Sequence, residues 1–107
     1  MALSTNTQTA SQIRNKAVGR VVTDAGAAAA TTFSCGFVPR EVRFHNLTDR
    51  ISDEWYEGMA ALSSLKTVAA GTRTLEVAAG ITITTDGFTV PAAMIPASKV
   101  FNWVAEG

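Results

Sequence analysis

The sequence has one cysteine, one histidine and no excess of charge, and each of these shortages excludes a class of protein. A single cysteine, Cys35, permits neither a disulfide within the chain nor a cysteine-based metal site, which fits synthesis in a reducing compartment. With His45 alone, a histidine-rich zinc site is excluded as well. Nine basic residues balance nine acidic ones, so the basic excess that nucleic acids and anionic membrane surfaces attract is missing.

Long apolar stretches are also missing. No run approaches the roughly 20 apolar residues that a membrane-spanning helix needs. The first ten residues contain no basic residue and no apolar segment, so we expect no signal peptide. These absences predict a soluble protein made in the cytosol.

The chain of 107 residues and 11.2 kDa is long enough for one domain. Its hydrophobic content of 47% includes 18 alanines, so large apolar side chains are few and the core is thin. Residues 1–12 are small and polar, which predicts a flexible N-terminal arm ending at Gln12. We expect residues 13–107 to form a single domain that gains stability by burying surface against a partner or further copies of itself.

Short apolar stretches separated by turn residues fill the rest of the chain. They recur about every 8 to 12 residues, which is typical of an antiparallel β-sandwich or barrel and not of alternating strands and helices. The expected strands cover residues 15–23, 30–37, 41–46, 53–60, 65–68, 73–77, 81–85, 88–90 and 99–105.

Four stretches carry more specific signals. In residues 41–46, Val42 and Phe44 alternate with Arg43 and His45, so we expect the first pair to be buried and the second to face solvent or a partner. Phe101 and Trp103 likewise share one face of the last strand. Asp86-Gly87 predicts a hairpin with a type I′ turn. Residues 55–65 also fit a helix by apolar spacing, although Gly58 disfavours it.

The sequence offers little for catalysis. Cys35 and His45 form a nucleophile and base only if folding brings them together, and burial of Cys35 is the simpler interpretation. The one carboxylate cluster lacks a calcium-loop pattern and is interpreted as a charged loop or exposed face; it comprises Asp49, Asp53, Glu54 and Glu57. Phosphate-binding loops and nucleophile elbows are absent. We therefore predict a protein that is not an enzyme and uses no cofactor.

Two features favour an interaction surface. Trp55-Tyr56 lies among acidic residues, as interface anchors often do, although burial of Trp55 in the core is an equal alternative. Residues 1–48 carry five basic and two acidic residues, a net +3, whereas residues 49–86 carry three basic and six acidic, a net −3. Such regions can meet between neighbouring copies or pair within one domain.

The central blocks of the chain resemble a small protein family of tailed bacteriophages. The resemblance covers about residues 18 to 106 and is carried by Gly36–Arg50, Glu54–Met59, Leu65–Leu75, Gly80–Ile83 and Gly87–Val90. It implies a head decoration (cement) protein: a jelly-roll-like β-sandwich that binds the outside of the major capsid shell in the virion, as a dimer or trimer, and stabilises it. Between Val90 and Lys99 the chain is shorter than the resemblance leads us to expect, so any function of that loop in the family is not carried over to this chain.

On this interpretation we expect contacts with the capsid protein or with neighbouring copies from Gln12, Arg40, Arg43, Arg50, Trp55, Tyr56 and Arg73. Two other classes stay open. A tail- or fibre-associated β-sandwich module has the same all-β pattern. A small carbohydrate-binding sandwich would use Trp55 and Tyr56 as a stacking platform. An enzyme that uses Cys35 is a distant fourth alternative.

Overall fold

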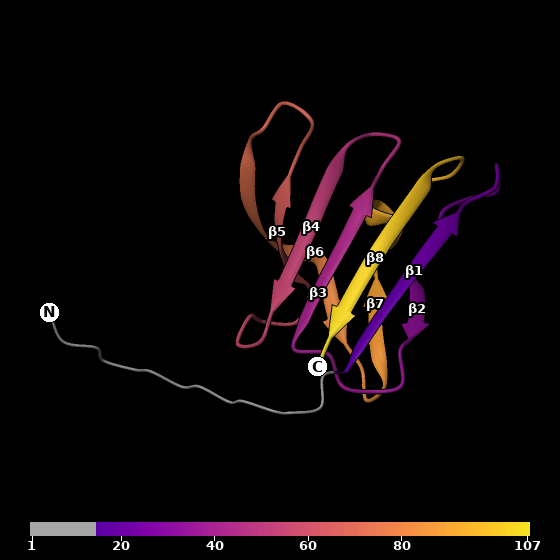
Figure 1. Cartoon of the computed structure of the whole chain (residues 1–107). Coiled ribbons are helices and arrows are strands. Elements are labelled where there is room, and N and C mark those ends of the chain that lie inside the picture. Colours follow the sequence, from indigo (N-terminus) through magenta and orange to yellow (C-terminus); the bar gives the residue numbers. More distant parts are fainter. Residues whose placement is uncertain (1–14) are drawn as a thin grey trace, which may run out of the picture.

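The computed structural model describes residues 15–107, so the expected arm at residues 1–12, with Gln12, lies outside the described part of the chain. The chain folds into one curled antiparallel sheet with strand order β1-β8-β3-β4-β5-β6-β7-β2 (Figure 1). The expectation of an all-β, antiparallel protein is confirmed. The elements are β1 Lys16–Val22, β2 Thr31–Ser34, β3 Glu41–Asn46, β4 Ile51–Tyr56, β5 Ser63–Thr67, β6 Arg73–Ile83, β7 Gly87–Val90, the 3-10 helix η1 Ala92–Met94, and β8 Val100–Glu106.

The sheet curls because β6 pairs with different strands along its length. Its first part pairs with β5, its last residues pair with β7, and the register shifts between Ser63 and Ser64. At this crossing a Cβ on Gly80 would lie 2.2 Å from the carbonyl carbon of Ser63, so only glycine lets the two strands approach. The expectation of two strands, 73–77 and 81–85, separated by a turn at Gly80 is therefore wrong.

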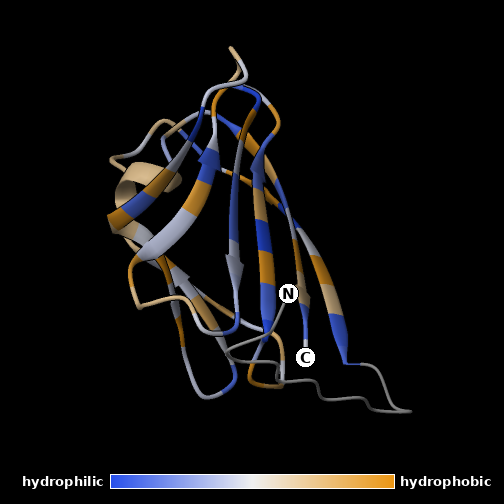
Figure 2. Ribbon diagram, turned by 90° about the vertical axis from the view of Figure 1, so that its left-hand side faces the viewer, coloured by the Kyte–Doolittle hydropathy of each residue, from blue (hydrophilic) through white to orange (hydrophobic). Residues whose placement is uncertain are grey.

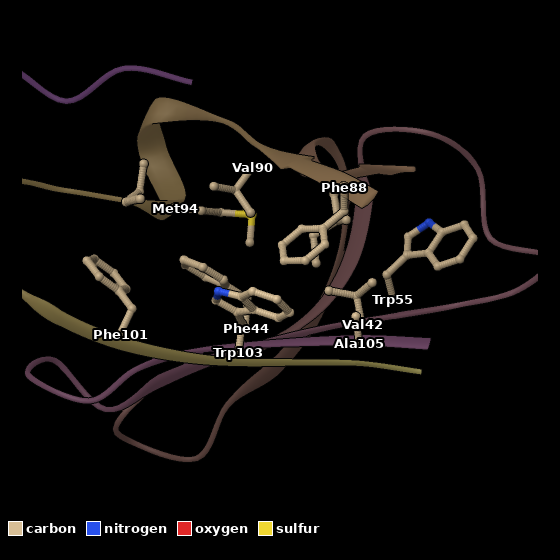
Figure 3. Packing of buried hydrophobic residues seen from close by; sticks show 11 residues of the cluster. Val42, Phe44, Trp55, Phe88, Val90, Met94, Phe101, Trp103 and Ala105 are labelled. Atoms are coloured by element: carbon tan, nitrogen blue, oxygen red, sulfur yellow. The ribbon is translucent and has the colours of Figure 1, made fainter. Parts of the chain in front are cut away.

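The curl brings β2 and β7 opposite β3 and β8, with aromatic rings between them. The ring centroid of Phe33 in β2 lies 5.9 Å from that of Phe44 in β3 and 5.8 Å from that of Trp103 in β8. Figure 3 shows the packed cluster, with β7 and η1 on one side of the rings and β3 and β8 on the other. The predicted shared faces of Val42 with Phe44 and of Phe101 with Trp103 are confirmed, and all four side chains are buried.

The hairpin between β6 and β7 forms where it was expected, but its turn is not of type I′. The amide of Thr84 donates to the carbonyl of Gly87 at 2.9 Å, and no residue from Thr84 to Gly87 has the positive φ that a type I′ turn requires. Gly87 is needed for a different reason. A Cβ there would lie 1.8 Å from the carbonyl oxygen of Phe33, across the pairing of β7 with β2.

The segment from Trp55 to Leu65 is strand, turn and strand, not helix. Strand β4 begins and ends earlier than the expected strand 53–60, and Gly58 follows it with φ +99°. Leu62, with φ 62°, comes directly before β5. Within residues 15–107, no helix has the length and apolar character needed to cross a membrane.

Candidate interaction surface

The residues that alternate with the core form a broad outer face on the sheet. This outer face extends over β1, β8, β3, β4, β5 and the first half of β6, because paired residues of neighbouring strands project to the same side. Figure 2 shows the hydrophilic and hydrophobic residues alternating along these strands. His45 lies on the outer face, as expected, and accepts or donates a hydrogen bond with Ser52 across 3.0 Å.

Charges at the centre of the outer face are paired with one another. An Nη of Arg43 donates to Glu41 at 2.9 Å, and this bond raises the pKa of the Arg43 guanidinium. The hydroxyl of Tyr56 donates to Glu54, and this bond raises the pKa of the Tyr56 phenol. Arg43 and Tyr56 are therefore accessible side chains held in position by neighbouring carboxylates.

Trp55 is not available as a surface anchor. Its side chain lies in the core with 8% of the residue exposed, and its Nε1 donates to the carbonyl of Ala60 at 3.3 Å. Strand alternation explains why Trp55 is buried while Tyr56 faces outward, since adjacent residues of β4 point to opposite sides of the sheet. Of the expected aromatic pair, only Tyr56 faces outward, and a stacking platform made of both rings is excluded.

The remaining expected contact residues lie apart from one another. Arg40 precedes β3 and donates to Glu57 at 2.8 Å, whereas Arg50 lies in the turn after β3 with φ 58°. Arg73 begins β6 and donates to the hydroxyl of Thr67 at 3.2 Å. Among the ion pairs of residues 15–107, only Arg40–Glu57 joins the net-positive region 1–48 to the net-negative region 49–86. Most of the charge asymmetry is therefore not neutralised by pairing between the two regions.

Asp53 departs from the expectation that the carboxylate cluster is exposed. It is only 3% exposed because it shares the inward phase of Trp55 in β4. Its carboxylate accepts a hydrogen bond from Ser64 at 2.8 Å, and the ammonium of Lys66 lies 3.9 Å away. Burial raises the pKa of Asp53 above its ordinary value, while these two partners act in the opposite direction.

Asp53 lines a small cavity of mixed polar and apolar lining beside η1. The cavity has a volume of about 50 Å³ and is also lined by Asn46, Asp49, Lys66 and Met94. Asp49 closes one side through bonds from Asn46 at 2.9 Å and Lys99 at 3.0 Å, and the bond from Lys99 lowers its pKa. This volume holds a few water molecules. The cavity is therefore too small for an organic substrate, and its polar groups serve to close one end of the sheet.

The structure does not bring the side chains of Cys35 and His45 together. Cys35 follows β2, packs against the core and directs its thiol to the carbonyl of Phe37 at 3.4 Å, whereas His45 projects from the outer face. In the part of the chain that the structure describes, no three His, Cys, Asp or Glu side chains gather where they could hold a metal ion.

Exposed aliphatic side chains mark both lateral ends of the outer face. Val18 and Val22 in β1 are 68% and 61% exposed, and Leu75 and Val77 in β6 are 59% and 73% exposed. Sequence reasoning missed them. The adjacent Val21 and Val22 leave the phase of β1 ambiguous until its pairing with β8 is known.

No family model, no curated protein and no solved structure matches the chain.

Proposed function

We propose that this chain is a structural protein of a tailed-phage particle, a decoration protein that binds the outside of the major capsid shell and stabilises it. In this proposal the protein acts as a dimer or trimer, is made in the host cytoplasm, performs no catalysis, and contacts neither nucleic acid nor membrane. The resemblance of the central sequence blocks suggests the particle, and the surface of the folded chain supports assembly.

The observation that carries the proposal is the exposure of aliphatic side chains on the two strands at the lateral ends of the outer face. The other exposed large aliphatic side chains lie in connections between strands: Val38, Leu47 and Leu62. Val18 and Val22 lie on β1, and Leu75 and Val77 lie on β6, five strand positions away in the sheet. Water-exposed valine and leucine side chains are stabilised when another surface covers them. A subunit with two such places can contact two neighbours at once, as members of rings and lattices do.

We further propose that the curled sheet is best classed as a β-sandwich of jelly-roll type. Strands β2 and β7 lie over β3 and β8, and the rings of Phe33, Phe88 and Trp103 pack between them. A rigid two-layer body of this kind presents a broad sheet face to a partner.

A tail- or fibre-associated module would share this architecture, and the number of copies separates the two. A decoration protein is needed in hundreds of copies per particle, whereas a tail part is needed in few. Quantitative mass spectrometry of purified virions, with electron microscopy of filled heads, tests the proposal. We expect high copy number and density on the outer shell. Absence from filled heads would refute the decoration role, and low copy number with density on the tail would favour the alternative.

A carbohydrate-binding role has less support, because Trp55 is buried and Tyr56 alone faces outward.

A further inference from the structure

A row of hydrogen-bond donors crosses the outer face from one lateral end to the other. Strand register links each member to the next, from β1 through β8, β3, β4 and β5 to β6. Strand alternation directs all of these side chains outward, and none of them is a carboxylate. We call this set the donor row: Arg20, Asn102, His45, Ser52, Thr67 and Arg73.

The arginines at the two ends of the donor row carry charge that the domain does not neutralise. The ion pairs of residues 15–107 occupy Lys16, Arg40, Arg43, Lys66 and Lys99, and include neither Arg20 nor Arg73. Both arginines are exposed, and within residues 15–107 the only side-chain bond of Arg73 runs from its Nε to Thr67 and does not involve its terminal N–H groups.

Nearby carboxylates on the outer face are already engaged. Glu41 accepts from Arg43, and Glu54 accepts from the hydroxyl of Tyr56. Glu106 lies 3.9 Å from the ammonium of Lys16. The carboxylates of another molecule can therefore pair with Arg20 and Arg73 without competition from these three.

Aliphatic side chains accompany both free arginines. Arg20 lies between Val18 and Val22 on β1, and Leu75 follows Arg73 by two residues on the same side of β6. An arginine beside exposed aliphatic surface is a common composition for the contact points of protein interfaces. The donor row crosses five inter-strand steps of about 4.8 Å, which is a path of about 24 Å along the curled sheet. That span suits a protein surface and exceeds a small ligand.

We propose that the outer face is the docking surface for a protein partner that presents separate carboxylates to Arg20 and Arg73. The inference rests on the proposed function, in which that partner is the capsid shell. A nucleic acid fits less well, because its continuous phosphate chain would also pass the carboxylates of Glu41, Glu54 and Glu106 on the same face. A folded protein can place its carboxylates only where the arginines are.

Charge reversal at the two ends of the donor row tests the proposal. The probes are a random copolymer of alanine with sparse glutamate, whose carboxylates are separated along a flexible chain, and a 30-base-pair DNA duplex, whose phosphates are continuous. Each is titrated with the full chain at low salt. We expect the wild-type chain to bind the copolymer more tightly than the duplex. Arg20→Glu with Arg73→Glu should weaken copolymer binding at least about tenfold, since two exposed arginine–carboxylate contacts are lost and replaced by repulsion.

The matched control is Lys16→Glu with Arg40→Glu. It changes the net charge by the same amount but alters cations that already have carboxylate partners, at the starts of β1 and β3 and away from the donor row. We expect its copolymer affinity to stay within about twofold of wild type. Equal losses in both double variants would overturn the proposal, because net charge alone would then explain binding. Absence of copolymer binding, or equal binding of the duplex, would also overturn it.

A second measurement separates this inference from the proposed function. If the protein decorates virions, Arg20→Glu with Arg73→Glu should abolish its attachment to shells that lack it. Unchanged attachment would overturn the docking surface and leave the decoration role intact. Absence of the protein from virions would refute the decoration role, whereas the copolymer result would still stand.

Discussion

Replacement of Gly80 by alanine is the most direct test of how the sheet curls. The new Cβ would lie 2.2 Å from the carbonyl carbon and 2.4 Å from the carbonyl oxygen of Ser63, whereas ordinary contact begins near 3.4 Å. Both obstructing atoms belong to the backbone, so no side-chain rotation relieves the overlap. The strands β5 and β6 must separate by about 1 Å to restore normal contact distances.

That separation costs hydrogen bonds and packing at the crossing. The amide of Gly80 donates to the carbonyl of Leu62 at 2.9 Å, and the amide of Leu62 donates to the carbonyl of Ile81 at 3.1 Å. Both bonds would exceed hydrogen-bonding length, at about 1 kcal/mol each. Ile81 is fully buried and would lose contacts as well. We expect Gly80→Ala to lower the free energy of unfolding by about 2–4 kcal/mol and Tm by about 10–20 °C.

Urea titration followed by far-ultraviolet circular dichroism, together with a thermal scan, measures this change. The control is Gly26→Ala, where the nearest atom is Oδ1 of Asp24 at 3.0 Å, the end of a flexible side chain. We expect the control to stay within about 0.5 kcal/mol of wild type. If Gly80→Ala matched the control, the close approach of β5 and β6 would be refuted as the reason for glycine at this position.

Two further predictions concern β4. Trp55→Ala should lower the free energy of unfolding by about 3–5 kcal/mol, because it empties part of the core. Tyr56→Phe should change the free energy of unfolding by about 0.5 kcal/mol or less. Urea titration of both variants checks this, and equal effects would contradict the assignment of Trp55 to the core. The raised pKa of Asp53 means that its contribution to stability is greatest at acidic pH and declines as pH rises through the folded-state pKa. The free energy of unfolding of Asp53→Asn relative to wild type should therefore increase between about pH 4 and pH 7, and a difference independent of pH would contradict the effect of burial.

Local patterns predicted part of the candidate surface. The alternation in residues 41–46 correctly separated Val42 and Phe44 from Arg43 and His45, because side chains in a strand point to opposite sides with a period of two. The same rule did not decide between Trp55 and Tyr56. Both are aromatic and their flanking residues are acidic, so composition alone leaves the phase of β4 undetermined.

Other features of the surface depend on residues far apart in the sequence. Arg20 and Arg73 lie in one row only because β1 pairs with β8 and β5 pairs with β6, which no local pattern specifies. The burial of Asp53 likewise depends on Ser64 and Lys66, which approach it from the neighbouring strand.

The amino-acid sequence by itself determined that this protein is built from short antiparallel strands, since alternation and turn residues act over a few positions. Tertiary structure decided how the strands form one curled sheet. Gly80 illustrates the division: the sequence Ala-Ala-Gly is typical of a turn, yet Gly80 lies within β6, where it allows the close approach of Ser63. Pairing between distant strands therefore places the charges of the outer face, because each strand's register sets which side chains become neighbours.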